Sequence, residues 1–379
     1  AQVFVAILAG LEQTPSYNRC ITLHELGRCF AFQGQPVQAE QLFRQELDEL
    51  VQLEQNYLVQ RQTGLAWTGL ADALRHQWQY REAKEAYKAG LEIAEEQGNT
   101  RGVAVSKAQL GTLAFLQDEL AEAAERHNEA QVLFQSINEP VMEAVAWHQL
   151  GIVYQKAEQW EMAEYAYRQA ARLREEQGLL AGNNGACQSW QHLGQVCSYT
   201  GRKTEAEQWF SKALAVCKEQ KDWPNAAHAL ISLASLLAND PARLDEARGY
   251  AEEGVAISET LDPAVAQIWK TCEILARIAD QQGESSQAAE YRAKSRQAYF
   301  AFPGWRQQLY QHEPLIAAVV QGADVEAALA RYGEAWANLK AAIQRILDGE
   351  RDEAALYEPL DYTDAAIIHA ILEGIKEQA

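Results

Sequence analysis

Proline, long apolar runs and basic residues are all scarce in this 379-residue sequence. Only nine prolines argue against disorder, and the lack of a long apolar run excludes a membrane-spanning helix. Lys and Arg number 33 against 53 Asp and Glu, which gives a formal net charge of −20. Phosphate backbones and anionic membranes require a basic surface, so we expect neither nucleic acid nor a membrane as a partner.

The sequence motifs of metal and nucleophile sites are also missing. His24-Glu25 lacks the second histidine of a zinc-protease helix. Cys187, His192 and Cys197 follow one another in steps of five residues, which turns successive side chains about 140° apart on a helix, so they cannot converge on one ion. No cysteines have the Cys-x-x-Cys spacing, and we interpret all six as reduced core residues of a cytoplasmic protein. We therefore expect no metal, no cofactor and no enzyme, with a hydrolase built on Cys and His as the alternative.

A regular repeat is the most informative feature that is present. Seven times a small residue, usually after leucine, is followed twelve or thirteen residues later by alanine. The second members are 44, 40, 40, 43, 41 and 41 residues apart. A fixed period of this size predicts a solenoid of helix pairs, so we expect an all-α, right-handed superhelical fold. The pairs are Gly27/Ala39, Ala71/Ala83, Gly111/Ala123, Gly151/Ala163, Gly194/Ala206, Ala234/Ala247 and Ala276/Ala288.

Small and large residues alternate regularly within each unit. In the fourth unit the first helix carries Trp147, Leu150, Gly151 and Tyr154, and the second carries Ala163, Tyr167 and Ala170. These spacings place each set on one helix face. We expect the small residues where two helices cross closest and the aromatic residues in the gap beside that crossing. A bulky side chain at a packed crossing costs roughly 1–3 kcal/mol, so the alternation is a packing requirement.

This pattern resembles the tetratricopeptide repeat (TPR) family, whose signature has Trp, Leu-Gly, Tyr, Ala, an aromatic residue and Ala at these offsets. The resemblance covers residues 16–300 in about seven repeats. Residues 1–15 are the end of a preceding helix or a partial repeat, and 301–379 form a helical C-terminal capping region without the repeat. The seventh unit departs from the signature, with Arg292 at the aromatic position, as expected of a terminal unit.

The long period and the C-terminal segment resemble the sensor arrays of bacterial STAND signalling ATPases. The segments concerned are residues 343–356, Ile-Gln-Arg-Ile-Leu-Asp-Gly-Glu-Arg-Asp-Glu-Ala-Ala-Leu, and 364–374, Asp-Ala-Ala-Ile-Ile-His-Ala-Ile-Leu-Glu-Gly. In that class an effector domain and a nucleotide-binding domain precede the array. No Gly-x-x-x-x-Gly-Lys-Ser/Thr motif occurs in this sequence. Because the sequence begins inside a helical pattern, we expect it to be a piece of a longer protein with a fused or separate ATPase or effector domain.

One side of each first helix is expected to face the concave groove of the superhelix. Counted from the small residue, offsets −3, +1, +4 and +5 should point into it. The predicted partner-binding residues are His24, Arg28, Phe32, Asp72, Arg75, His76, Phe115, His148, Gln155, Lys156, Gln191, Gln195 and Tyr199. Over the first four units these offsets hold three basic residues and a single acid, Asp72. We therefore predict an acidic or amide-rich partner segment that contacts Arg28, Arg75 and Lys156, with Phe32, Phe115 and Tyr199 as apolar anchors. The alternative is a chance mixture of polar positions.

The resulting prediction of function is a protein- or peptide-recognition module. Its sharper form is the ligand-sensing array of a STAND-type signalling or defence protein, in which binding along the groove shifts the array between two arrangements. A passive cytoplasmic scaffold or assembly factor, which joins partners without switching, is the alternative.

Overall fold

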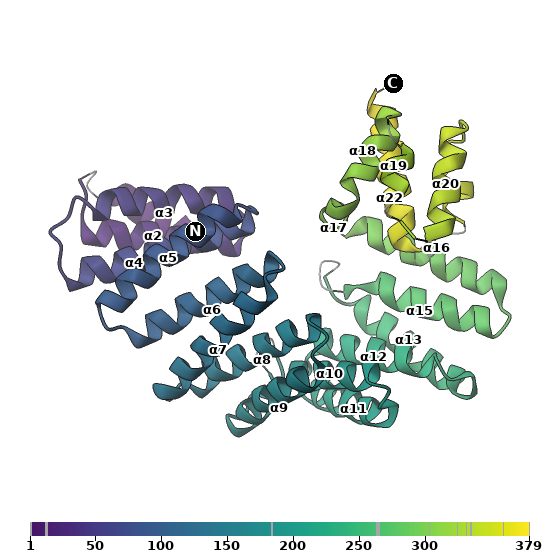
Figure 1. The fold of residues 1–379 in the computed structure, drawn as a ribbon, viewed down its shortest axis with the longest axis horizontal. Helices are drawn as coiled ribbons and strands as arrows, with labels where there is room; N and C mark the ends of the chain where they lie inside the picture. Colours follow the sequence, from purple (N-terminus) through teal and green to yellow (C-terminus); the bar gives the residue numbers. More distant parts are fainter. Residues whose placement is uncertain are drawn as a thin grey trace. The chain divides into compact units, whose positions relative to one another are not determined.

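The computed structural model describes residues 2–11, 14–182, 185–262, 266–302, 304–323, 325–330, 332–333, 336–358 and 360–378. Within these residues the chain is helical, and no strand occurs (Figure 1). Contacts divide the chain into two units, residues 1–180 with 184–196 and residues 181–183 with 197–379. The prediction of an all-α solenoid made of consecutive helix pairs is confirmed.

The first unit begins with α1 and continues with antiparallel helix pairs. Each of α2/α3, α4/α5, α6/α7 and α8/α9 is a packed pair, and the second helix of each of the first three pairs also packs on the first helix of the next. The helices are α1 (Gln2–Gly10), α2 (Tyr17–Phe32), α3 (Pro36–Leu50), α4 (Tyr57–His76), α5 (Tyr80–Glu96), α6 (Thr100–Leu116), α7 (Leu120–Ser136), α8 (Pro140–Lys156), α9 (Trp160–Glu176) and most of α10 (Ala186–Tyr199), whose residues from Cys197 onward belong to the second unit.

Glycine permits the close crossing inside the α2–α3, α6–α7 and α8–α9 pairs. A methyl group on Gly151 would lie 2.5 Å from Cε1 of Tyr167, and one on Gly27 would lie 3.0 Å from the Phe43 ring. The same position in α6, Gly111, faces the ring of His127 at 2.9 Å. In each case the aromatic side chain of the second helix covers the small residue of the first, as the alternation in the sequence predicts.

Many of the turns between successive helices pass through a residue with left-handed backbone. Glycine occupies this place at Gly98 (φ 62°) and Gly178 (φ 71°), whereas Glu158 occupies it with φ 56°. The chain then closes a six-residue hydrogen-bonded turn, as when Gln159 N donates to Tyr154 O at 2.8 Å. Only glycine adopts this conformation without a steric cost of roughly 1–2 kcal/mol, so the non-glycine turns retain strain.

Replacing Glu158 by glycine should therefore stabilise the α8–α9 pair. The side chain of Glu158 is exposed and has no partner among the described residues, so its loss removes no contact. We expect a gain of about 1 kcal/mol, measured as a rise in the thermal midpoint by circular dichroism. Gly178→Ala is the matched reverse change and should lower the midpoint. A Glu158→Gly variant that melts at or below the wild-type temperature would contradict the assignment of strain to this turn.

The second unit contains further helix pairs and a C-terminal group of helices. Trp269 and Tyr299, from the last pair, join Leu315, Ile343 and Ile368 in one apolar core. The helices are α11 (Lys203–Glu219), α12 (Trp223–Leu237), η1 (Pro241–Arg243), α13 (Leu244–Ser258), α15 (Ile268–Gln281), α16 (Ser285–Ala301), α17 (Trp305–Gln308), η2 (Tyr310–His312), α18 (Glu313–Gln321), α19 (Val325–Leu329), α20 (Ala337–Leu347), α21 (Glu353–Tyr357) and α22 (Tyr362–Gln378). The C-terminal helices thus cover the apolar end of the α15–α16 pair.

The cysteines are free, and all except Cys29 are buried. Burial raises the pKa of the Cys20 thiol to about 12 and that of Cys272 to about 11. Both thiols are therefore protonated at neutral pH, which suits a role in the core. None of the described helices is long and apolar enough to cross a membrane.

Candidate partner-binding groove

The first helices α2, α4, α6 and α8 carry most of the predicted groove residues. Those at offsets +1, +4 and +5 from the small residue are exposed or half-buried, as expected. His24, His148 and Gln191, all at offset −3, are buried instead. The expectation that offset −3 points into an open groove is therefore wrong for these three residues.

His24 is buried because it belongs to a polar network between the first two helix pairs. Its Nδ1 lies 3.1 Å from Oε2 of Glu46, and Gln62 Nε2 donates to Oε1 of the same carboxylate at 2.7 Å. The imidazole also meets the Phe43 ring edge to face, with ring centroids 5.4 Å apart. Burial raises the pKa of the Glu46 carboxyl above its ordinary value. His24 therefore stabilises the packing and does not face a partner.

His148 lies in a second buried cluster, with Arg174 of α9 and Ser189 of α10. Its Nδ1 is 3.1 Å from Ser189 Oγ, and Arg174 donates to the same oxygen at 2.8 Å. Burial holds the pKa of His148 well below its ordinary value, and nearby His192 and Arg174 lower it further. Burial also lowers the pKa of Arg174 to about 10. This side chain is likewise part of the packing.

Asp72, Arg75 and His76 lie together at the end of α4. Tyr87 of α5 donates its hydroxyl hydrogen to Asp72 Oδ1, and Arg75 Nε donates to the same hydroxyl oxygen at 3.4 Å. Arg75 also lies 3.3 Å from His76 Nε2. Burial and the Arg75 cation lower the pKa of His76, so this imidazole is neutral at pH 7. The cluster presents one compensated charge pair and one neutral ring.

Phe115 and Lys156 meet across two neighbouring repeats. The Lys156 ammonium lies 4.9 Å from the centre of the Phe115 ring and 2.7 Å from Asp118 Oδ1. The ring face attracts the cation, and the carboxylate neutralises it. This arrangement offers an aromatic surface with a fixed charge pair at its edge.

Gln155 and Gln195 form a short row of amides along the first helices α8 and α10. Tyr167 donates its hydroxyl hydrogen to Gln155 Oε1 at 2.8 Å, and Gln155 Nε2 points to Gln195 Oε1 at 3.4 Å. The tyrosine fixes the orientation of the first amide and thereby of the second. Each amide keeps donor or acceptor capacity for the backbone of an extended peptide.

The remaining predicted residues stand apart from these clusters. Phe32 is 84% exposed at the end of α2, and Arg28 forms an ion pair with Glu25 at 3.0 Å. Tyr199 is exposed and lies in the second unit, so it is not positioned relative to the others.

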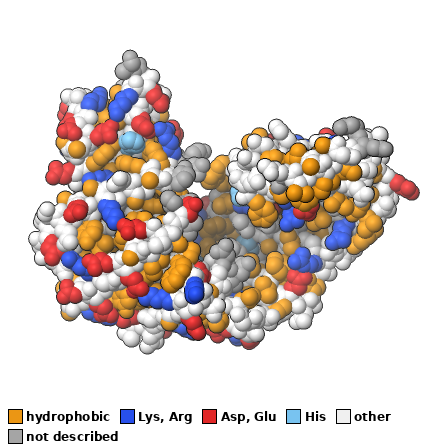
Figure 2. Space-filling model, turned by 180° about the vertical axis from the view of Figure 1, so that it is seen from behind, with side chains coloured by type: hydrophobic (Ala, Val, Ile, Leu, Met, Phe, Trp, Pro, Cys, Tyr) orange, Lys and Arg blue, Asp and Glu red, His pale blue; other side chains and the backbone are white. Residues whose placement is uncertain are grey.

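The charges at these positions are more balanced than the sequence suggests. Arg28, Arg75 and Lys156 each lie within 4 Å of a carboxylate, from Glu25, Asp72 and Asp118 respectively. Acidic and basic side chains are likewise interspersed on the face drawn in Figure 2. The three cations expected to attract an acidic partner are therefore already compensated.

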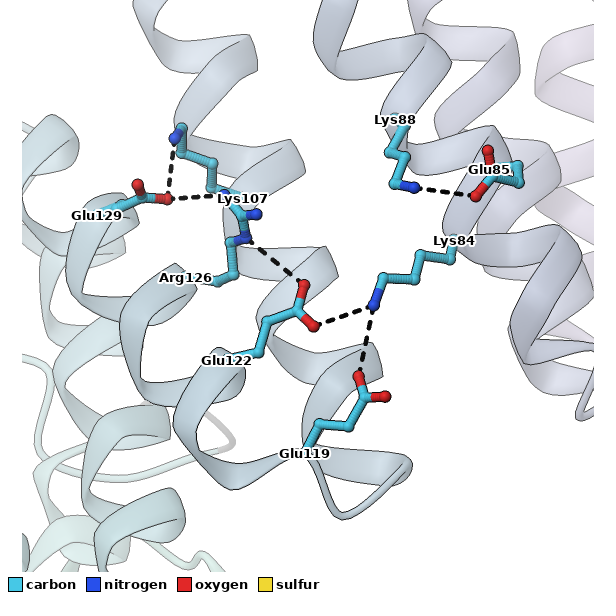
Figure 3. A network of polar contacts seen from close by, with 8 residues as sticks. All are labelled: Lys84, Glu85, Lys88, Lys107, Glu119, Glu122, Arg126 and Glu129. Carbon is cyan, nitrogen blue, oxygen red and sulfur yellow. Dashed lines mark hydrogen bonds and ion pairs between the residues drawn. The ribbon is translucent and has the colours of Figure 1, made fainter.

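Ion pairs also join neighbouring repeats through their second helices (Figure 3). Lys84 of α5 reaches Glu122 of α7 at 3.0 Å and Glu119 at 3.4 Å. Further along α7, Arg126 and Lys107 share the carboxylate of Glu129. The hydrogen bond from Lys84 lowers the pKa of the Glu122 carboxyl. Such exposed pairs contribute roughly 0–1 kcal/mol each to stability. Lys84, Lys107 and Arg126 are thus already paired with glutamates of the same chain.

A cavity that the sequence analysis did not predict opens between α4 and α6. Its volume is about 310 Å³, and α5 forms its floor. Its lining includes three glycines, one from each helix: Gly64, Gly90 and Gly102. Gly64 and Gly102 stand seven and nine residues before the small residues of their helices, outside the offsets −3 to +5, so the repeat pattern did not single them out.

Among the described residues, no group of three or more His, Cys, Asp or Glu side chains is placed to hold a metal ion. The arrangement on the first helices is one of hydrogen-bonding amides, aromatic surfaces and compensated charges. Such a surface can bind a polypeptide segment.

Comparisons with known proteins agree with this geometry. Residues 22–56 match one tetratricopeptide repeat model, and residues 142–219 and 185–260 match another. No curated protein matches the sequence.

Solved structures give the same fold at low sequence identity. A signal transduction ATPase with numerous domains (STAND) from Pyrococcus horikoshii, with a tetratricopeptide repeat sensor, matches with a TM-score of 0.63 and 16% identity over 78% of this chain and 44% of its own. The apo form of RapI matches with a TM-score of 0.53 and 13% identity, over 74% of this chain and 97% of RapI. A Rap protein complexed with competence and sporulation factor matches with a TM-score of 0.52 and 16% identity, over 95% and 98% of the two chains. The helix pairs, their small-to-aromatic crossings and the model matches agree that residues 22–56 and 142–260 are tetratricopeptide repeats, and the solved structures show the same fold beyond them.

Proposed function

We propose that this protein recognises a polypeptide segment along its first helices and serves as the ligand-sensing array of a STAND-type signalling or defence protein. A tetratricopeptide repeat array is a protein-interaction module, and this one has a row of oriented amides and aromatic residues on the expected side. The observation that carries the proposal is the oriented pair Gln155–Gln195, which is fixed by Tyr167 and spans two repeats.

The sensor role is supported by similarity to the STAND structure over 78% of this chain. Because this chain covers only 44% of that protein, the ATPase and effector parts belong to the proposal as separate or fused domains. Similarity to the Rap complex supports a peptide as the kind of ligand. The cytoplasm, where such signalling proteins act, is part of the same proposal.

Peptide binding can be tested with the whole chain and a displayed library of random twelve-residue peptides. We expect selected peptides to lose about tenfold in affinity for the Gln155→Ala/Gln195→Ala double variant, because each lost hydrogen bond is worth about 0.5–1.5 kcal/mol. Gln169→Ala, on second helix α9, is the control and should bind as the wild type does. Selected peptides that bind the double variant unchanged would rule out the amide row as the site.

Switching is tested on the same complex by small-angle scattering. A sensor should change its radius of gyration when the selected peptide saturates it, because neighbouring repeats make only local contacts and can shift together. A passive scaffold should keep its dimensions. Unchanged scattering at saturation would therefore favour the scaffold over the sensor.

A further inference from the structure

The cavity between α4 and α6 differs in charge from the rest of this acidic protein. Two arginines, Arg61 and Arg101, line it, and none of its fourteen lining residues is an aspartate or glutamate. The chain as a whole contains 53 acidic and 33 basic side chains. Two other cavities, beside α3 and α5, include Asp48 in one and Glu82 with Glu85 in the other. Of these three cavities, the one between α4 and α6 is the one whose lining contains arginines and no carboxylate.

The two arginines occupy the same register in successive repeats. Each stands ten residues before the small residue of its helix, Arg61 before Ala71 and Arg101 before Gly111. The first, fourth and sixth repeats have Tyr17, Val141 and Pro224 at this offset. Only the two helices that border the cavity thus carry an arginine there. Both arginines lie near the N-terminal ends of their helices, α4 and α6.

Arg61 and Arg101 differ in their availability. Arg101 forms an ion pair with Glu139 at 2.7 Å. Arg61 is exposed, and no carboxylate of the described residues lies within ion-pair distance of it. The predicted groove cations Arg28, Arg75 and Lys156 are all compensated. The guanidinium of Arg61 is therefore the cation at this cavity that is available to a ligand.

Unused hydrogen-bonding groups lie deeper in the same cavity. Ser106 is only 4% exposed, and its hydroxyl makes no hydrogen bond with the described residues. The Nε2 of Gln97 is buried without a hydrogen-bond partner. Leaving this buried amide nitrogen unpaired costs about 1–3 kcal/mol, which a ligand oxygen would recover. Both groups can donate a hydrogen, as can Arg61, so the cavity is suited to an acceptor.

Apolar residues, among them Leu65, Ile93 and Val105, also line the cavity. Gly64 and Gly90 approach so closely that a methyl group on Gly90 would lie 3.3 Å from the Gly64 carbonyl oxygen. Leu65 and Tyr57 are exposed at the rim, and Ile93 lies inside. A volume of about 310 Å³ is at the small end of ligand pockets, enough for one large side chain and a neighbouring polar group.

We propose that this cavity is a specificity pocket that receives a large apolar side chain of the partner segment, with an adjacent aspartate or glutamate bound by Arg61. The proposal rests on the peptide-recognition function proposed above, and it specifies two adjacent partner residues that the protein recognises, one large and apolar and one acidic. Charge complementarity identifies the occupant: donors and a free guanidinium face the ligand, and carboxylates are excluded from the wall. A partner with a basic residue at this place would leave two cations facing each other.

Three pools of synthetic heptapeptides, each with a fluorescent label and fixed central residues Phe-Glu, Phe-Gln or Phe-Lys, test this directly. Binding to the whole chain is measured by fluorescence anisotropy. We expect the Phe-Glu pool to bind about fivefold more tightly than the Phe-Gln pool, because an ion pair with an exposed arginine contributes up to about 1 kcal/mol. Arg61→Glu should remove this preference and favour the Phe-Lys pool.

Arg81→Glu is the matched control, since Arg81 is an exposed arginine of the same unit that lines a different cavity, beside α3 and α5. It makes the same change in net charge and should leave the preference intact. Equal binding of the three pools, or a Phe-Glu preference that survives Arg61→Glu, would refute the pocket while peptide recognition stands. Failure of every pool to bind would also refute the pocket, whereas peptide recognition itself is decided by the library-selected peptides described above.

Discussion

Replacing Gly151 by alanine is expected to destabilise the α8–α9 pair, although alanine is the better helix former. The added methyl carbon would lie 2.5–2.8 Å from three atoms of the buried Tyr167 ring, and Tyr167 is fully enclosed. The ring cannot move outward without opening the crossing. Overpacking of this kind costs about 1–3 kcal/mol, which exceeds the gain of roughly 0.5–1 kcal/mol in helix propensity.

The effect should be measured as a lower thermal midpoint and as faster amide hydrogen exchange in α8 and α9. Exchange is the sharper measurement, because a repeat array can lose one pair before the others. Gly249→Ala is the control: Gly249 lies within α13, and a methyl group there meets no atom within 4 Å. This variant should gain stability. If both variants shift stability in the same direction, the close crossing at Gly151 does not limit the packing.

The sequence was sufficient to predict this crossing because the interacting residues recur at fixed spacing. Gly151 and Tyr167 are sixteen residues apart, as are Gly27 and Phe43, and both pairs are in contact. A contact that repeats in every unit appears as a period in the sequence. The helix pairs and their packing faces could therefore be predicted without coordinates.

Contacts that occur only once could not be predicted in this way. His24 reaches Glu46 and His148 reaches Ser189, at sequence separations of 22 and 41 residues. Their offset from the small residue marks them as groove residues, but a buried polar group must find a partner, and these partners lie on neighbouring helices. The offset from the small residue alone does not show whether a long polar side chain faces the open groove or is buried between helices.

The pairing of Arg28, Arg75 and Lys156 with carboxylates was also not predicted, because it too depends on individual contacts that do not repeat along the sequence. Asp118, which neutralises Lys156, lies in the turn after α6 and not at a groove offset. A count of charges at groove offsets omits such residues. Arg61 was missed for the opposite reason, because it stands ten residues before Ala71 and outside the offsets that were counted.

The third repeat departs from the pattern at a buried position, with a consequence for acid stability. His127 stands where Phe43, Tyr87, Tyr167 and Phe210 stand in other repeats, and it is 1% exposed against Gly111. Neither ring nitrogen has a hydrogen-bond partner. Burial lowers the pKa of His127 to about 4. The unfolded chain binds a proton below pH ~6.5, whereas the folded chain stays neutral down to about pH 4.

Stability should therefore fall as the pH is lowered through this window, and His127→Phe should remove that part of the loss. Protonation of this histidine in the unfolded chain lowers the free energy of unfolding by about 2 kcal/mol at pH 5 and by almost nothing at pH 8. We expect His127→Phe to be stabilising at both pH values, since it removes two unpaired nitrogens, and more so at pH 5 by about 2 kcal/mol. Denaturant unfolding at the two pH values gives the difference directly.

Other buried histidines also titrate, so the comparison of variant and wild type at each pH is what isolates His127. Burial likewise lowers the pKa values of His148 and His228, and both histidines are present in the wild type and in the His127→Phe variant. Phe210→His, at the equivalent buried position of the fifth repeat, should introduce a new acid sensitivity of the same sign. An advantage of His127→Phe that is equal at pH 5 and pH 8 would mean that the folded protein protonates this ring as readily as the unfolded chain does, and that the α6–α7 crossing is open to water.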